Sequence, residues 1–233
     1  MPAAGVGGVG RALDVAATLE RLRGRIVDAG GDAARVRVVA VTKGFGTDAV
    51  LAALAAGIPD VGENYAQELL SKDSALRDLS AEPGVRWHFL GAVQRNKVAR
   101  LAPIVSCWQC LAREVEGEAI ARRRPGAVVL VEVDTTEVPG RNGCPPGAVP
   151  ALVRGLRAEG LDVRGLMTVA PPDPEGARRA FRAVRALADD LGLPERSMGM
   201  SDDLELAVAE GSTMVRVGRA LFGDRPARRD IAT

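Results

Sequence analysis

Lysine is rare in this chain, which makes a reactive amine the first chemical feature to consider. Of its 31 basic residues, only Lys43, Lys72 and Lys97 are lysines. A Schiff base with an aldehyde requires a primary amine, which arginine does not have. Lys72 lies among polar residues in LLSKDSALRD, and Lys97 lies near the start of an expected helix in QRNKVAR. We expect both to be solvated, so Lys43 is the strongest candidate for a nucleophilic amine.

Lys43 stands at the end of the first strand-like segment, VRVVAVTK (36–43). It follows Val39 and Val41 at a spacing of two, so the three side chains are expected on one face of a strand. If that face is the interior of a barrel, the amine emerges at the carboxyl end of the strands, where barrel enzymes place their chemistry. Desolvation there lowers a lysine pKa and makes the amine a better nucleophile. The alternative is an ordinary surface lysine just past a strand.

A phosphate site is suggested near the other end of the chain, in SMGMSDDLELAVAEGSTMVRVGRALFG (197–223). Two strand-like segments there end in small residues, and the loops after the last two strands of a (β/α)8 barrel often bind phosphate. We expect Ser201 to open a helix, whose free N–H groups attract anions. Gly218 lets the backbone approach closely, and Arg219 follows it. The acidic residues 202–203 suit a helix start but would repel a phosphate unless they point away.

Arg216 lies inside the last strand-like segment, on the same face as Met214 and Gly218. A buried arginine needs a partner. One candidate is the pyridine nitrogen of pyridoxal phosphate (PLP), which an arginine leaves unprotonated and therefore a weak electron sink. The other is a carboxylate of the barrel, such as Glu132 or Asp134. The sequence leaves both open.

Other polar residues near strand ends have a structural and a functional interpretation. Asn64, in GENYAQE, is placed either to bond the phenolic oxygen of such a cofactor or to cap the helix that follows. His88 is the only histidine and lies on a strand, where a hydrogen-bonded core residue is more common than a catalyst. Cys107 and Cys110 form a CxxC pair without a second pair, so a four-ligand zinc site is not expected.

The composition is that of an ordinary globular protein, with 47% hydrophobic and 26% charged residues among 233 and a net charge of +1. The basic residues are scattered, which gives no case for a nucleic-acid partner. No apolar run is long enough for a transmembrane helix, and the N-terminal residues lack the features of a signal peptide. Three cysteines do not form a disulfide framework. We therefore expect a cytoplasmic protein without membrane or nucleic-acid partners.

Strand-like and helix-like segments alternate along the chain. Several strand-like segments are nearly continuous in Val, Ile and Leu, as in parallel strands buried on both faces. Eight of them with helices between fit a (β/α)8 TIM barrel better than the alternative, an open doubly wound sheet. An extra helix over about 11–28 precedes the first strand, and we expect a single domain over 1–233 with its core at about 11–225. The expected strands are 36–43, 59–64, 85–91, 104–108, 127–134, 163–170, 196–201 and 214–218, and the expected helices between them are 47–57, 64–79, 95–102, 110–124, 146–159, 173–192 and 202–211.

Several of these segments, taken together and in order, resemble one known family. They are VAVTKG, DVGENYAQE, WHFLGAVQRNK, VRGLMTVA and the long C-terminal motif SMGMSDDLELAVAEGSTMVRVGRALFG. The chain is similar to the pyridoxal phosphate homeostasis protein family, which consists of single-domain relatives of the N-terminal barrel of alanine racemase. The similarity runs from about residue 11 to 225.

The resemblance implies a fold-type III barrel that carries PLP as a Schiff base on Lys43, with Arg216 at its ring nitrogen. It also implies phosphate contacts from Ser201, Gly218 and Arg219. The family usually has a threonine after this glycine, and here the guanidinium of Arg219 takes the place of the hydroxyl group. The further cofactor contacts that we expect are Val41, Asn64, His88, Met167 and Met200.

The resemblance also implies a protein that buffers or delivers PLP, with the apo-forms of PLP enzymes as candidate recipients. The alternative is a PLP-dependent racemase, which needs a base on each face of its substrate. The second base of alanine racemase is implied to be a tyrosine from a separate domain, and the only tyrosine here is Tyr65. We therefore expect little or no racemase activity. A Schiff-base aldolase and a binding module without covalent chemistry are further alternatives. We expect a monomer.

Overall fold

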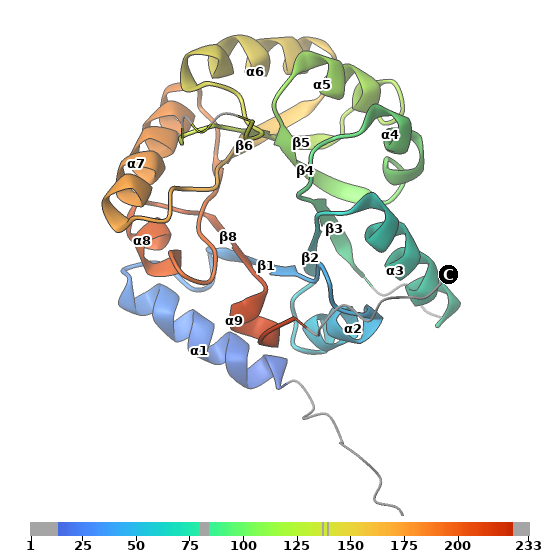
Figure 1. The fold of residues 1–233 in the computed structure, drawn as a ribbon, viewed down its shortest axis with the longest axis vertical. Helices are drawn as coiled ribbons and strands as arrows, with labels where there is room; N and C mark the ends of the chain where they lie inside the picture. The colour runs from blue at the N-terminus through green and yellow to red at the C-terminus, as the bar shows by residue number, and fades with distance from the viewer. Residues whose placement is uncertain (1–13, 80–83, 137, 139, 226–233) are drawn as a thin grey trace, which may run out of the picture.

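A closed barrel of eight parallel strands forms the centre of the molecule (Figure 1). The computed structural model describes residues 14–79, 84–136, 138 and 140–225. Each strand pairs with the next along the chain, and the last pairs with the first. This confirms the predicted (β/α)8 barrel and excludes the open sheet. The strands are β1 (Arg37–Val41), β2 (Asp60–Glu63), β3 (Arg86–Phe89), β4 (Val105–Leu111), β5 (Val128–Glu132), β6 (Asp162–Met167), β7 (Glu195–Ser197) and β8 (Met214–Val217).

Helices cover the outside of the barrel, one after each strand (Figure 1). The extra helix α1 (Val15–Asp28) precedes β1 as predicted, although residues 11–13 of the predicted segment lie outside the described residues. Its buried side chains Leu19, Leu22 and Ile26 pack into a cluster with residues of β8 and the helices beside it. The other helices are α2 (Thr47–Ala55), α3 (Ala66–Asp78), α4 (Arg95–Leu101), α5 (Glu114–Ala121), the 3-10 turn η1 (Pro146–Ala148), α6 (Val149–Ala158), α7 (Pro174–Asp190), α8 (Leu204–Ala209) and α9 (Arg219–Phe222).

Most element boundaries differ from the prediction by a few residues, and three of these differences bear on the site. β1 ends at Val41, so Lys43 lies in the turn after the strand rather than at its end. β7 ends at Ser197 instead of residue 201, because its pairing with β8 is limited to Ser197 and Met214. β4 continues to Leu111, where the sequence predicts a helix from residue 110, because Leu111 still pairs with β5 and is fully buried. The hydrophobic pattern thus predicts where the strands lie, but hydrogen bonding between adjacent strands determines where each one ends.

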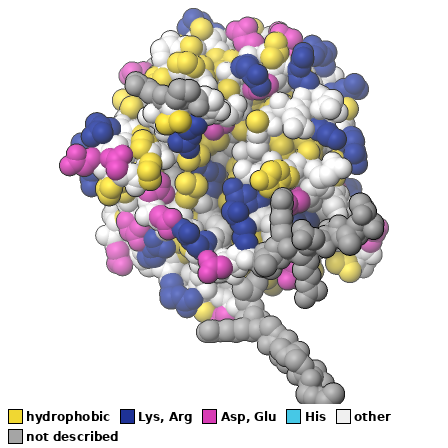
Figure 2. Space-filling model, viewed as in Figure 1, with side chains coloured by type: hydrophobic (Ala, Val, Ile, Leu, Met, Phe, Trp, Pro, Cys, Tyr) yellow, Lys and Arg dark blue, Asp and Glu magenta, His cyan; other side chains and the backbone are white. Residues whose placement is uncertain are grey.

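The surface of the barrel carries charges of both signs. Acidic and basic side chains lie interspersed over the face shown in Figure 2. Many form ion pairs along a helix, as in Arg23–Glu20 and Arg77–Asp73. Exposed pairs of this kind contribute roughly 0–1 kcal/mol each, so the fold depends far more on its core and its buried pairs. None of the described helices is both long enough and apolar enough to cross a bilayer.

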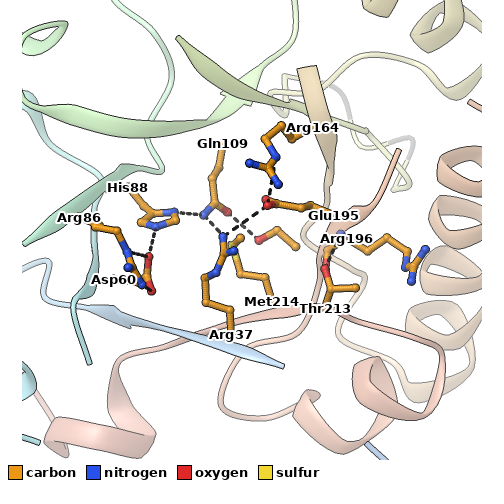
Figure 3. Close-up of polar contacts among 11 residues, drawn as sticks. Arg37, Asp60, Arg86, His88, Gln109, Arg164, Glu195, Arg196, Thr213 and Met214 are labelled. Carbon is orange, nitrogen blue, oxygen red and sulfur yellow. Dashed lines mark hydrogen bonds and ion pairs between the residues drawn. The ribbon is translucent and has the colours of Figure 1, made fainter. Parts of the chain in front are cut away.

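Polar side chains fill the inside of the barrel near the amino ends of the strands, where TIM barrels usually hold branched aliphatic residues (Figure 3). Asp60, the first residue of β2, accepts hydrogen bonds from Arg86 Nε at 2.9 Å and Nη2 at 2.6 Å. Its Oδ1 also lies 2.8 Å from His88 Nε2. Burial by itself would raise the pKa of Asp60, but the hydrogen bonds from His88 and Arg86 outweigh it and hold the pKa well below its usual range.

We expect Asp60→Asn to lower the free energy of unfolding at neutral pH by about 1–3 kcal/mol, because His88 and Arg86 lose a charged acceptor. A carboxyl group whose pKa is depressed by folding contributes stability above its unfolded value of about 3.9, and this contribution is lost as the pH falls through the lower folded value. The difference between the two proteins, measured by urea unfolding, should therefore shrink in acid. Asp78→Asn, on an exposed position of α3, is the control. Equal stability at neutral pH would contradict the role given to Asp60.

Candidate functional site

A cavity of about 650 Å³ opens at the carboxyl ends of the strands. This volume lies within the range of roughly 300–1,000 Å³ that is typical of small-molecule sites. It is lined by residues of β1, β5, β6 and β8 and of the segments that follow β1, β2, β3, β6, β7 and β8. It therefore occupies the position where barrel enzymes bind their ligands. All the predicted cofactor contacts except His88 lie in its wall, namely Val41, Lys43, Asn64, Met167, Met200, Ser201, Arg216, Gly218 and Arg219.

Lys43 lies in the cavity wall and is half-buried, which excludes the alternative of an ordinary surface lysine. Burial lowers the pKa of its amine, and the guanidinium groups of Arg225 and Arg216 lower it further, while Glu63 acts in the opposite direction. Within the part of the chain that the structure describes, no hydrogen bond or ion pair engages the Lys43 amine. A larger fraction of this amine than of a solvated lysine is therefore neutral and nucleophilic at neutral pH.

The second lysine, Lys72 on α3, is only 5% exposed, so the prediction of a solvated helix position is wrong. Its Nζ donates to the backbone carbonyl of Thr42 at 2.8 Å and to Glu63 Oε1 at 2.5 Å. Thr42 Oγ1 donates to the same carboxylate oxygen at 2.6 Å. The sequence missed this burial because the partner carboxylate comes from β2, not from the polar helix sequence around Lys72. The ion pair holds the residue that precedes Lys43.

The other side of the Lys43 turn is also tied to α3. The backbone N–H of Gly44 donates to Glu68 Oε2 at 2.9 Å, and Gly44 has a φ of 77°, a conformation that favours glycine. Burial raises the pKa of Glu63 even though Lys72 opposes the shift. In the described part of the chain, Oε2 of Glu63 is buried without a hydrogen-bond partner. Carboxylates and an ammonium group on α3 and β2 thus hold the turn on both sides of Lys43, so its amine is presented to the cavity on a supported backbone.

Arg216 extends from β8 into the same cavity and is buried. Its Nη1 donates to the carbonyl of Ser197 at 2.6 Å and to its hydroxyl at 2.8 Å, and Nη2 donates to the carbonyl of Thr168 at 2.8 Å. Neutral oxygen atoms, rather than the carboxylate partner considered from the sequence, are its hydrogen-bond acceptors. Burial lowers the pKa of Arg216 to about 10, so the group stays charged at neutral pH.

The three residues of the predicted phosphate seat meet at one side of the cavity, but not in the predicted way. Ser201 lies in a turn, and α8 begins only at Leu204, so the argument from a helix N-terminus is wrong. The local reason is that the carboxylate of residue 203 accepts from the backbone N–H of residue 200 and holds the chain in the turn. Ser201 Oγ accepts from the N–H of Ala220 at 3.1 Å. A Cβ on Gly218 would lie 2.9 Å from the carbonyl oxygen of Val41, so this position requires glycine.

Arg219 is largely exposed, and its Nη2 forms an ion pair with the carboxylate of Asp202. Both side chains line the cavity. The acidic residue that would repel a phosphate is therefore neutralised by the residue expected to attract it. A guanidinium has five N–H donors, so Arg219 can keep this pair and still donate to an anion.

His88 is misplaced in the prediction of cofactor contacts. It does not line the cavity, and its two ring nitrogens are bonded to Asp60 and to Gln109 inside the barrel. The hydrogen-bonded core histidine was therefore the better interpretation. Asn64 does line the cavity, and the cap position of α3 is Tyr65 instead of Asn64. The Oδ1 atom of Asn64 is buried without a hydrogen-bond partner among the described residues, which leaves it available to a ligand.

Sequence reasoning also missed several cavity residues. Glu132 had been considered only as a partner of Arg216, but it lines the cavity and receives a hydrogen bond from Asn142 Nδ2. Burial raises its pKa, although the hydrogen bond from Asn142 and the charge of Arg216 oppose the shift. Arg225 lines the cavity after α9. No local pattern marks that arginine, because its position depends on where the chain leaves α9.

The fold first defines the class: the molecule is a barrel of the alanine racemase N-terminal type. The family model described as "Alanine racemase, N-terminal domain" matches residues 16–226. A pyridoxal phosphate homeostasis protein from Pseudomonas aeruginosa is 39% identical over 221 residues, which are 91% of this chain and 94% of the relative. The corresponding protein from Deinococcus radiodurans is 41% identical over 218 residues, 90% of this chain and 100% of the relative. The chain belongs to the pyridoxal phosphate homeostasis protein family.

Solved structures agree with this assignment. PipY of Synechococcus elongatus PCC7942 is 31% identical in its structure without PLP, with a TM-score of 0.79 over 90% of this chain and 100% of that chain. Its structure with PLP bound is similar at a TM-score of 0.77 and 30% identity. Alanine racemase from Corynebacterium glutamicum, at 20% identity and a TM-score of 0.63, shares the fold over 90% of this chain but only 60% of its own.

We expect Lys72→Met to destabilise the protein by about 3–5 kcal/mol, because it leaves the buried Glu63 carboxylate without its counter-charge. The free energy of unfolding, measured by chemical denaturation, tests this. Lys97→Met, which removes the third lysine from α4, is the matched control and should change stability by less than about 0.5 kcal/mol. Similar small effects of both substitutions would show that the Lys72–Glu63 pair does not support the turn.

Proposed function

We propose that this chain binds PLP in the cavity, with Lys43 joined to it as a Schiff base, and that it acts in intracellular PLP homeostasis as a carrier. The observation that carries the proposal is the Lys43 amine, which is half-buried, has a lowered pKa and lines a cofactor-sized cavity together with Arg216. In this reaction the Lys43 amine attacks an aldehyde carbon, and the carbonyl oxygen leaves as water. PLP supplies that aldehyde and, in enzymes, an electron sink.

The polar groups of the cavity suit the other parts of PLP. Arg216 donates hydrogen bonds and gives up no proton near neutral pH, so it suits an unprotonated ring nitrogen. Asn64 has a buried polar atom without a protein partner in the same wall and suits the phenolic oxygen, with its amide turned as the ligand requires. Ser201, Gly218 and Arg219 offer a hydroxyl, a close backbone and a guanidinium for the phosphate. Met167, Met200 and Val41 supply apolar contacts.

A carrier is favoured over a racemase, which is the alternative. Racemisation needs two bases, and Lys43 supplies one. The only tyrosine, Tyr65, is 54% exposed and lines a smaller neighbouring pocket, not the main cavity. An unprotonated ring facing Arg216 is also a poor electron sink. Turnover of D- or L-alanine by the PLP-loaded protein would favour the racemase.

The proposal is tested by trapping the attached cofactor. PLP-loaded protein treated with borohydride should keep the cofactor through denaturation, and mass mapping should find it on Lys43, because reduction converts the Schiff base to a stable amine. Lys43→Ala should lose this adduct, whereas Lys97→Ala should retain it. Equal labelling in Lys43→Ala, or a stable non-covalent complex that borohydride does not change, would favour the non-covalent binding module.

Delivery predicts a kinetic result. Cofactor should pass from the loaded protein to an apo-form of a PLP enzyme faster than it dissociates into buffer, because a direct encounter avoids a free intermediate state. Recovery of the recipient's activity and the rate of release into a PLP-trapping buffer measure the two processes, with an equal concentration of free PLP as the control. Equal rates would indicate passive storage.

A cytoplasmic location, a monomeric state and a single domain over 1–233 also stay predictions.

A further inference from the structure

A line of buried hydrogen bonds crosses the barrel interior from β2 to the cavity. It begins at Asp60 and passes through His88, and Figure 3 shows this part together with Gln109. Gln109 Nε2 lies 2.6 Å from His88 Nδ1, and Gln109 Oε1 accepts from the hydroxyl of Ser197 at 2.6 Å. Ser197 Oγ in turn accepts from Arg216 Nη1 at 2.8 Å. All five side chains are buried.

The chemistry of its members gives this line one direction. The carboxylate of Asp60 can only accept, so Nε2 of His88 donates to it. At the other end, the amide oxygen of Gln109 accepts from Ser197, and its amide nitrogen faces Nδ1 of His88. The hydroxyl proton of Ser197 is thereby committed to Gln109, which leaves a lone pair of Ser197 Oγ facing Arg216.

This lone pair is the second acceptor of Nη1 in the Arg216 guanidinium, so both protons of that nitrogen have an acceptor. Both protons of Nη1 are used, one by the carbonyl and one by the hydroxyl of Ser197, and one proton of Nη2 is used by Thr168. Nε–H and the second proton of Nη2 have no acceptor among the residues that the structure describes. Nε and Nη2 share one edge of the planar group, and Arg216 lines the cavity.

We propose that Asp60, His88, Gln109 and Ser197 are positioning residues that fix the guanidinium of Arg216, so that its Nε and Nη2 edge stays available to the ring nitrogen of PLP. The identity of the ligand rests on the proposed function, but the orientation of Arg216 does not. If these hydrogen bonds served only to pair buried polar groups, they would stabilise the fold without fixing the orientation of the Arg216 guanidinium. The two roles make different predictions for the ligand-free protein.

The first test uses the ligand-free full chain labelled with 15N-arginine, with the Arg216 signals assigned by Arg216→Lys. In Ser197→Ala, exchange of the Arg216 Nη1 protons with water should be at least about fivefold faster, the factor that corresponds to one lost hydrogen bond. Gln109→Met should change the same signals, although Gln109 does not touch Arg216, and Gln109→Glu should restore them because its carboxylate again accepts from Ser197. Ser212→Ala removes another buried hydroxyl, bonded to the carbonyls of residues 198 and 214, and should leave them unchanged.

Unchanged Arg216 signals in both Ser197→Ala and Gln109→Met, with a lower melting temperature, would overturn the proposal and leave only a structural role. If Gln109→Met does not fold, Ser197→Ala and its control Ser212→Ala decide the outcome.

The second test uses the PLP-loaded chain. The visible absorption band should shift in Ser197→Ala but not in Ser212→Ala, and PLP release should be about fivefold faster. If the Arg216 signals respond as expected but no PLP binds to the unmodified chain, the proposed function fails while the positioning of Arg216 stands. The opposite outcome is that PLP binds and is trapped on Lys43 while Ser197→Ala and Gln109→Met leave the absorption band, the release rate and the Arg216 signals unchanged. In that case the proposed function stands and this inference fails.

Discussion

The buried ion pair between Lys72 and Glu63 is the interaction on which the geometry of the cavity depends. It lies directly behind the turn that carries Lys43 and bonds the carbonyl of the residue before it. Burying a charge is costly unless the charge is paired and hydrogen-bonded. Lys72 meets both conditions and has a structural role, whereas burial lowers the pKa of Lys43, which has no such partner among the described residues. The same side-chain type thus has two different roles on the two sides of one turn.

Buried hydrogen bonds inside the barrel link the amino ends of the strands to the cavity at their carboxyl ends. Aliphatic layers would fill this space with less specificity, because packing alone does not orient a polar group. Here Asp60, His88 and Gln109 occupy it, and each has hydrogen-bond partners. A buried polar line tolerates few arrangements, since every unpaired member costs free energy. Its far end is Arg216, so the amino ends of the strands help to define the shape of a cavity at the carboxyl ends.

The fold and most of the site were predictable because their signals are local. Buried parallel strands give continuous apolar runs, and the scarcity of lysine isolates Lys43. The burial of Lys72 was not predictable, since its partner Glu63 lies on a strand and the helix around it is polar. The sequence places His88 on a strand but does not fix which way its side chain faces or its depth along the barrel axis. Ser201 fits a helix start by its neighbours, yet a side-chain bond from residue 203 keeps it in a turn.

Under the proposed function, the charge of Arg216 favours carrying over catalysing. Its pKa is lowered only to about 10, so it remains a cation and a donor at neutral pH. A ring nitrogen that accepts a hydrogen bond from a cation is disfavoured from taking up a proton. An unprotonated pyridine withdraws electrons weakly. An acidic residue at this position would have the opposite effect. Under the proposed function, the cation at Arg216 would therefore keep the reactivity of a bound ring low, while Lys43, whose pKa is lowered by burial, would supply its attachment.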